Sequence, residues 1–206
     1  MAKELMLVRH ATIGPQYRGC FIGSTDVPLS EEGRRQTTLL AKVLRSKVPS
    51  RCLCSPMKRS LETARFTMGD TVVPIETDPD LREVDFGNWE GKILTEIEAA
   101  DPENVRRWKI FDENFCFPEG EGVSDFFKRV ERMTQRLTAD PGELIMVFTH
   151  GGVIRAMICY LLGLASHQYV HFDARPASVT TIEIYENKGI KGVLTGLNDR
   201  CHLRES

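Results

Sequence analysis

Two histidines occupy comparable places in the sequence, each separated by one residue from a short apolar run. Arg9 and His10 follow residues 5–8, and His150 follows residues 144–148 and precedes two glycines. An apolar run of this length is typical of a buried strand. A glycine pair after it lets an anion approach the backbone N–H groups at the start of a helix. Because the chain has only five histidines, this repetition favours a site built from His10 and His150.

Arg59 is a second basic candidate beside Arg9. A helix is expected to begin at Ser55-Pro56, with the serine as N-cap and the proline at the first helical position. Arg59 then lies in its first turns, near the positive end of the helix dipole. Guanidinium groups match phosphate oxygens bidentately, so Arg9 and Arg59 together would bind a phosphoryl group. Taken alone, an arginine at this place is more often a solvated helix residue.

Three carboxylates are candidates for acid chemistry. Glu83, Asp85 and Glu90 stand among apolar and aromatic residues in the segment 81–91. A partly desolvated carboxyl group in such surroundings suits a general acid. A charged loop without any chemical role is the alternative, and the residues themselves do not distinguish Glu83 from the other two.

Alternating strands and helices are expected to position these side chains. Strands are predicted over residues 5–8, 51–54, 71–75, 144–148, 179–185 and 192–197, the last two joined as a hairpin around 187–189. Helices are predicted from Ser30 to about Arg45, from Ser55, from Ser124, and from after His150 to about Leu162. The alternation predicts an α/β fold: a three-layer sandwich with a mostly parallel sheet and helices on both faces. The carboxyl ends of its strands would line the ligand crevice.

The segment at about 84–123 breaks this alternation. It holds both tryptophans, several phenylalanines and short charged helical stretches, but no strand-like pattern. We interpret it as an insertion that covers one end of the sheet. No repeat or linker divides the rest, so residues 1–206 are predicted to form a single domain.

Composition excludes several classes of function. The formal net charge is −2, which argues against nucleic acid or a membrane surface as the main partner. No apolar run is long enough to span a membrane. Cys52, Cys54 and Cys159 fall within apolar runs, as expected of thiols in a reducing compartment, so a cytoplasmic location is the default. No structural zinc pattern or magnesium-binding carboxylate cluster accompanies the histidines, and neither a metal nor a cofactor is expected. A homodimer is left open.

Four motifs occur in an order that carries a family resemblance. They are LVRHA at 7–11, SPMKRSLETA at 55–64, LREVDFG at 81–87 and THGG at 149–152. Together they resemble the histidine phosphatase superfamily, in its phosphoglycerate mutase-like branch, over about residues 5–198. The resemblance implies that His10 is the nucleophile, that Arg9 and Arg59 bind phosphate, that His150 is the second histidine and that Glu83 is the proton donor. It also implies Gln16, Gly23 and Gly151 as substrate-binding residues.

The sequence departs from the family pattern in places. Ala11 stands where the family usually has glycine, Gln16 falls where the mutases have an asparagine, and Gly152 replaces another asparagine of the mutases.

The resemblance implies a metal-independent phosphomonoester hydrolase that acts on a small phosphorylated metabolite through a phosphohistidine. The segment 18–29 is similar to that of small phosphatases, those for α-ribazole phosphate among them, so α-ribazole 5'-phosphate is a candidate substrate. The alternatives are phosphoglycerate mutase-type transfer, for which 206 residues leave little room for covering segments, and a non-catalytic module that binds phosphorylated ligands.

Overall fold

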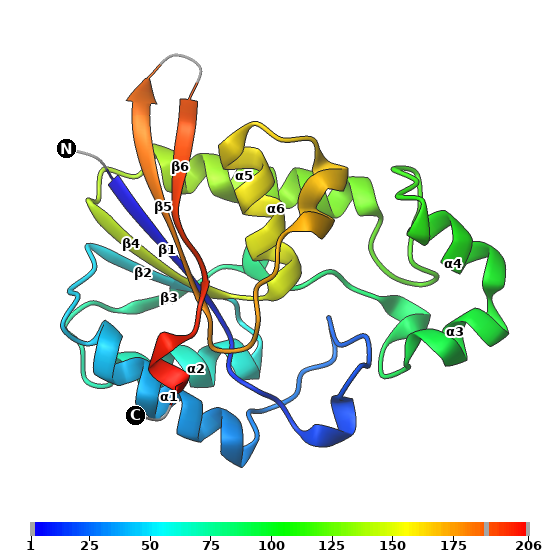
Figure 1. Cartoon of the computed structure of the whole chain (residues 1–206), viewed down its shortest axis with the longest axis horizontal. Coiled ribbons are helices and arrows are strands. Elements are labelled where there is room, and N and C mark those ends of the chain that lie inside the picture. The colour runs from blue at the N-terminus through cyan, green and yellow to red at the C-terminus, as the bar shows by residue number, and fades with distance from the viewer. Residues whose placement is uncertain (1–2, 188–189, 205–206) are drawn as a thin grey trace.

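Six strands form one mixed sheet in the computed structural model, which describes residues 3–187 and 190–204. The order across the sheet is β3-β2-β4-β1-β5-β6 (Figure 1). Parallel pairing joins β1 (Lys3–Arg9), β2 (Arg51–Cys54), β3 (Ile75–Thr77) and β4 (Leu144–Thr149), whereas β5 (Val179–Asn187) and β6 (Ile190–Asp199) are antiparallel. The α/β class and the mostly parallel sheet are thus confirmed. The turn predicted around 187–189 lies partly outside the described residues.

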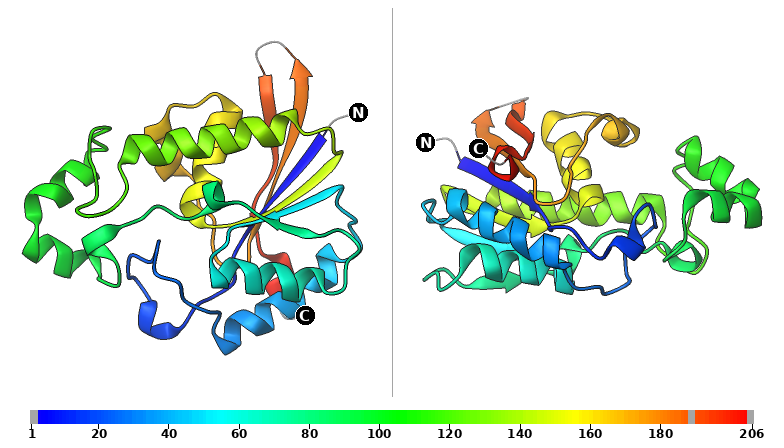
Figure 2. Two further views of the ribbon diagram at one scale, coloured as in Figure 1. Left: turned by 180° about the vertical axis from the view of Figure 1, so that it is seen from behind. Right: turned by 60° about the horizontal axis from the view of Figure 1, so that its bottom comes forward.

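Helices cover both faces of this sheet. The first pair is α1 (Glu31–Leu44) and α2 (Lys58–Met68), and the second is α5 (Val123–Ala139) and α6 (Gly151–Leu162). Figures 1 and 2 show the two pairs on opposite sides of the strands. Alternate residues of β1 divide between the two layers, because successive side chains of a strand point to opposite faces. Leu5 and Leu7 pack in the core with α5 and α6, and Met6 and Val8 pack in the core with α1 and α2.

Two predicted helix starts and one predicted strand are displaced in the structure. The second helix begins at Lys58 with Met57 as N-cap. The Ser55 hydroxyl accepts the Met57 N–H only at 3.4 Å and lies closer, at 2.8 Å, to Nε2 of His150. The helix expected from Ser124 begins at Val123, whose N–H is already held by the Phe115 carbonyl. The strand predicted at 71–75 lies at 75–77, since Pro74 has no N–H to give to a ladder.

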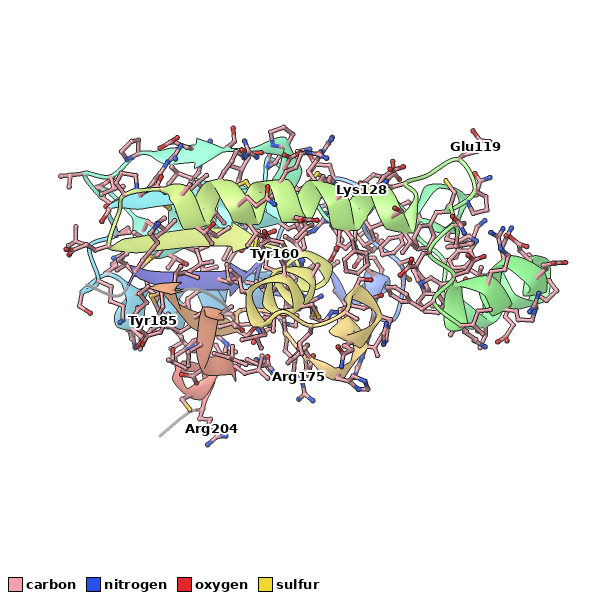
Figure 3. All side chains as sticks on the ribbon, turned by 90° about the horizontal axis from the view of Figure 1, so that it is seen from above. Glu119, Lys128, Tyr160, Arg175, Tyr185 and Arg204 are labelled. Atoms are coloured by element: carbon pink, nitrogen blue, oxygen red, sulfur yellow. The ribbon has the colours of Figure 1, made fainter. Side chains whose placement is uncertain are left out.

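The segment 84–123 extends beyond the carboxyl ends of the parallel strands. It contains a short 3₁₀ turn (Gly87–Trp89), α3 (Leu94–Ala100) and α4 (Pro102–Lys109). Figure 3 shows its helices next to Glu119, at the end of the molecule opposite Tyr185. Trp89, Val105 and Phe115 are buried in the same core cluster as the inner faces of α5 and α6. The segment is therefore anchored by apolar burial that it shares with the sheet layer.

The start of α1 provides a test of local stability. The Ser30 hydroxyl accepts a hydrogen bond from the Gly33 N–H at 3.0 Å and donates one to the Thr12 carbonyl at 3.0 Å. Ser30→Ala removes this cap, so the free energy of unfolding should fall by about 1 kcal/mol. Urea unfolding measures the change, with Ser46→Ala at an exposed position as the control, expected to stay within about 0.5 kcal/mol of the unsubstituted protein. Equal effects of the two changes would contradict the cap.

Candidate active site

Three strand ends meet at one edge of the sheet. β4 lies between β2 and β1, and the parallel register sets Arg9 beside Thr149 and Cys54 beside Phe148. This register brings together the residues that directly follow the three strands, which are His10 after β1, Ser55 after β2 and His150 after β4. The ring centroids of the two histidines are 5.1 Å apart. The pairing that the sequence suggested for these histidines is therefore present in space.

The His10 ring is arranged as a neutral nucleophile. Its side chain is buried, and Nδ1 lies 2.8 Å from the Ala11 carbonyl. A carbonyl oxygen only accepts, so Nδ1 carries the hydrogen and Nε2 keeps its lone pair. Burial, reinforced by the positive charges of Arg9 and Arg59, holds the pKa of His10 well below its usual value. The ring is therefore uncharged at neutral pH, as nucleophilic attack requires.

His150 is held in the opposite tautomer. The Arg59 Nε–H donates to Nδ1 of His150 at 3.3 Å. Nε2 must then carry the hydrogen, which it donates to the Ser55 hydroxyl at 2.8 Å. Burial and then the neighbouring charge of Arg59 hold the pKa of His150 well below its usual value. Ser55, which the sequence suggested only as a helix cap, is thus the residue that orients the second histidine.

Two guanidinium groups flank the histidines, that of Arg59 buried and that of Arg9 partly buried. Arg59 is fully buried and donates to the carbonyls of Gly23 at 2.7 Å and of Thr25 at 2.8 Å. Arg9 donates through Nη1 to the Ala174 carbonyl at 2.6 Å, and its Nε–H is buried without a partner among the described residues. Burial lowers the pKa of both groups, and the charge of Glu83 is the strongest influence opposing it. Both arginines remain charged at neutral pH.

Glu83 lies against the first turn of α6. Its carboxylate accepts the Gly152 N–H at 2.9 Å and the Val84 N–H at 3.1 Å. A Cβ on residue 152 would stand 2.3 Å from the Glu83 carboxylate, so a larger residue there would displace this side chain. Arg129, which the sequence did not single out, donates to the backbone carbonyls of Arg82 and Glu83. These contacts fix the carboxylate near the two arginines.

The other two carboxylates are committed to a neighbouring loop. Asp85 accepts hydrogen bonds from the Ser24 hydroxyl and the Gly87 N–H. Glu90 accepts N–H groups of the loop 23–25. Glu83 lines one of the two cavities at the site, whereas Asp85 and Glu90 line neither. The geometry therefore separates the three acids that the sequence left equivalent.

Two cavities are lined by residues of this site. One of about 690 Å³ is lined by Arg9, His10 and Arg59, with much of its remaining wall from the segment 12–22. The other, of about 150 Å³, is lined by Glu83, Gly152, Arg155 and mostly aromatic rings. The rings are those of Phe21, Phe86, Trp108, Phe111, Phe117, Phe126, Phe127 and Tyr169.

The remaining predicted site residues lie in different places. Gly151 begins α6, and a Cβ there would stand 3.2 Å from the Arg9 guanidinium. Gly23 lines neither cavity, and its N–H and carbonyl are taken by Glu90 and Arg59. Gln16 is exposed and lines neither cavity. Gly23 therefore contacts a site residue through its backbone, and Gln16 lies between Pro15 and Tyr17, which line the larger cavity.

Within the described residues, both a metal-binding cluster and a membrane-spanning helix are absent. No group of three or more His, Cys, Asp or Glu side chains within residues 3–187 and 190–204 is arranged to hold a metal ion. In the same part of the chain no helix is both long and apolar enough to cross a membrane.

Comparison with known proteins identifies the family. The model of the histidine phosphatase superfamily, branch 1, matches residues 5–199. The chain belongs to the histidine phosphatase superfamily. An adenosylcobalamin/α-ribazole phosphatase of Salmonella typhimurium is 32% identical over 89% of this chain and 91% of its own length. Phosphoserine phosphatase 1 of Hydrogenobacter thermophilus is 30% identical over 98% and 95% of the two chains. This histidine phosphatase is thus a phosphomonoester hydrolase that acts on a small phosphorylated metabolite.

A solved structure agrees with this histidine phosphatase over nearly its full length. The α-ribazole phosphatase of Shigella flexneri superposes with a TM-score of 0.86 at 29% identity. The match covers 95% of this chain and 96% of the other. The three-layer arrangement is therefore the phosphoglycerate mutase-like fold that the motifs implied.

The depressed pKa values can be tested directly by NMR titration. His10 and His150 should remain neutral as the pH is lowered from about 8 to about 6, where an ordinary histidine would be mostly protonated. Because the charge of Arg59 contributes to both depressions, Arg59→Met should move both pKa values back toward the usual range. Ring signals from the unsubstituted protein that titrate near pH 6.5 would contradict the neutral state.

Proposed function

We propose that His10 is the nucleophile of the phosphatase reaction. Nε2 attacks phosphorus in line with the leaving oxygen, the P–O bond to the alcohol breaks, and a phosphohistidine forms. Arg59 and the unpartnered Arg9 Nε–H are placed to hold the phosphoryl oxygens, and His150, whose two ring nitrogens contact Arg59 and Ser55, orients the Arg59 guanidinium beside them. They act by positioning and by electrostatic stabilisation, with no protein group needing to reorganise during the step. Gly151, at the start of α6, offers its backbone beside them.

Glu83 completes the proposed cycle as acid and then as base. It gives its proton to the leaving oxygen as the first P–O bond breaks. The resulting carboxylate takes a proton from water, whose oxygen attacks the phosphohistidine and releases phosphate and neutral His10. The carboxylate suits both steps because it lies close enough to Arg9 and Arg59 for its charge to act on them, and because it also lines the aromatic cavity. In this scheme the reaction uses neither a metal nor a cofactor.

The aromatic cavity on the Glu83 side carries the proposal for the substrate. The group that Glu83 protonates must lie on this side, so the alcohol would enter the cavity. An apolar cavity of about 150 Å³ accepts a ring about the size of benzene. The Arg155 guanidinium lies over the Tyr169 ring at 4.7 Å and offers a flat platform in the wall. We therefore propose an alcohol that bears an aromatic ring, and α-ribazole 5'-phosphate is the named candidate.

Phosphoserine is the second candidate, and a specific observation favours it. Arg155 is a cation in the same wall, and it would pair with a carboxylate. One relative at 30% identity is named a phosphoserine phosphatase. Mutase transfer has less support, since the wall that carries Arg155 is otherwise mostly aromatic and neither relative described above is named a mutase.

A substrate panel with trapping of the intermediate tests this proposal. Purified protein in excess EDTA is assayed with α-ribazole 5'-phosphate, phosphoserine and 3-phosphoglycerate, and acid-labile phosphate is mapped after a rapid quench. The highest kcat/KM is expected for the aromatic ester, with label on His10 and none in His10→Ala. A higher kcat/KM for phosphoserine would make phosphoserine the substrate in place of α-ribazole 5'-phosphate. Label on a residue other than His10 would reject the mechanism. Loss of activity in EDTA would show that the enzyme needs a metal ion.

Leaving-group dependence tests the role of Glu83. Glu83→Gln should slow turnover of alkyl phosphates on the order of 100- to 10,000-fold, as expected for loss of a general acid. Aryl phosphates leave without much protonation, so they should still phosphorylate His10, and slow hydrolysis should then produce a stoichiometric burst. Asp85→Asn is the matched control and should behave like the unsubstituted protein. The same burst from Asp85→Asn, with Glu83→Gln near normal, would show that the wrong carboxylate was chosen.

The setting of the enzyme is also part of the proposal. All six cysteines fall within the described residues and are unpaired, which suits a reducing compartment such as the cytoplasm. We take residues 1–206 as one domain whose segment 84–123 covers the cavity. The partner in this proposal is a small phosphorylated metabolite, not nucleic acid or a membrane.

A further inference from the structure

The Glu90 carboxylate collects an unusual number of hydrogen-bond donors. Within one loop it accepts the N–H groups of Gly23 at 2.9 Å, Ser24 at 2.8 Å and Thr25 at 3.2 Å, together with the Thr25 hydroxyl at 2.5 Å. It also accepts the Phe86 N–H at 3.2 Å. Two carboxylate oxygens offer about four acceptor sites, so this side chain is fully used. Most of its contacts fix the backbone of the loop 23–25, whose three residues line neither of the two cavities.

The same loop holds Arg59 through its opposite backbone groups. While its N–H groups face Glu90, the carbonyls of Gly23 and Thr25 accept from the two Nη atoms of Arg59. The third nitrogen, Nε, donates to His150. Every nitrogen of the guanidinium therefore donates one hydrogen bond to the protein, and each Nη keeps a second N–H that can bind a ligand. The direction of those two N–H bonds depends on where the loop lies.

The loop also lies directly against the segment that carries the acid. A Cβ on Gly23 would stand 1.8 Å from the Val84 carbonyl, next to Glu83. Only glycine permits this approach. The loop thus sets the spacing between Arg59 and Glu83, which in the proposed reaction hold opposite ends of the breaking P–O bond. Glu90 also supplies negative charge near Arg59, which is fully buried.

We infer that Glu90 is a positioning residue for phosphoryl transfer, and that it acts through the loop 23–25 to aim the Arg59 guanidinium at the phosphoryl group. The inference rests on the proposed function of Arg59 as a phosphoryl-binding group. Glu90 touches neither the substrate nor the reacting atoms in this scheme. A loop that merely stabilised the fold would not need both sets of its backbone groups directed at charged side chains.

The variant that tests this is Glu90→Gln. An amide nitrogen does not accept hydrogen bonds, so at least two donors of the cluster lose their acceptor while side-chain size is kept. Asp85→Asn is the matched control from the same segment, because its remaining oxygen can still accept from Ser24 and Gly87. An aryl phosphate is the substrate of choice, since its departure does not depend on Glu83.

Three quantities are measured for each variant: the melting temperature, the dissociation constant for inorganic vanadate and the single-turnover rate of His10 phosphorylation. Glu90→Gln should lower the phosphorylation rate on the order of 100-fold, as expected of a misplaced catalytic group, and should weaken vanadate binding. The control should change neither. A folded Glu90→Gln protein with normal vanadate affinity and a normal rate would overturn the inference.

A double-mutant cycle shows whether the effect passes through Arg59. In an Arg59→Met background, adding Glu90→Gln should change vanadate affinity and rate little further, because the group that it positions is already gone. Losses that multiply would overturn the inference. If Glu90→Gln does not fold, Thr25→Val enters the same cycle, since it removes the hydroxyl contact to Glu90 and keeps the carbonyl contact to Arg59.

The cycle also separates the inference from the proposal on which it rests. Normal vanadate affinity in Arg59→Met would remove the proposed role of Arg59, and the inference with it. A protein that binds vanadate but forms no phosphohistidine would refute the proposed function alone. The cycle in vanadate affinity would then still decide whether Glu90 positions Arg59.

Discussion

The burial of two positive charges in one small site governs the arrangement around it. Removing an ion from water costs several kcal/mol even after the protein relaxes, and here the Arg59 side chain and the Nε of Arg9 are buried, with the charge of Arg59 acting on Arg9. Both neighbouring histidines stay neutral, because their own burial lowers their pKa values and the arginine charges lower them further. Glu83 supplies part of the missing negative charge, and a phosphomonoester, which is largely a dianion at neutral pH, would supply more. The positive charges that would attract the substrate therefore also help to keep the nucleophile neutral.

The fold satisfies this constraint mostly with backbone groups. Arg59 is held by two loop carbonyls and one imidazole, and Arg9 by the carbonyl of Ala174. Neutral acceptors of this kind fix the geometry of a guanidinium without cancelling its charge. The parallel register of β2, β4 and β1 brings these groups to one edge, and Gly151 and Gly152 allow α6 to begin against them. A carboxylate in ion-pair contact with each arginine would have left less positive charge for the phosphoryl group.

Local patterns were sufficient to predict the site residues at strand ends. His10 and His150 could be recognised because an apolar run, a histidine and the start of a helix are adjacent in the sequence. The prediction for Ser55 was incomplete, because the local sequence does not distinguish a serine that caps a helix from one that orients a histidine 95 residues away. Glu83 and Glu90 could not be separated on the same ground, since the Glu90 contacts reach a loop 67 residues earlier. The contact between Arg155 and Tyr169 could not be predicted from the sequence, because the two side chains stack only in the folded chain.

The chemical groups and the cavity wall come from different parts of the chain. The histidines and arginines lie at strand ends and the first turns of helices, whereas Trp108, Phe111 and Phe117 of the aromatic cavity belong to the segment 84–123. Mutational drift in that segment could therefore remodel the wall after gene duplication while the reaction itself was conserved. Relatives with similar identity to this chain are named for α-ribazole and for phosphoserine, as expected if specificity diverges faster than catalysis. Paralogues of this architecture would then be distinguished by their cavity linings rather than by their motifs.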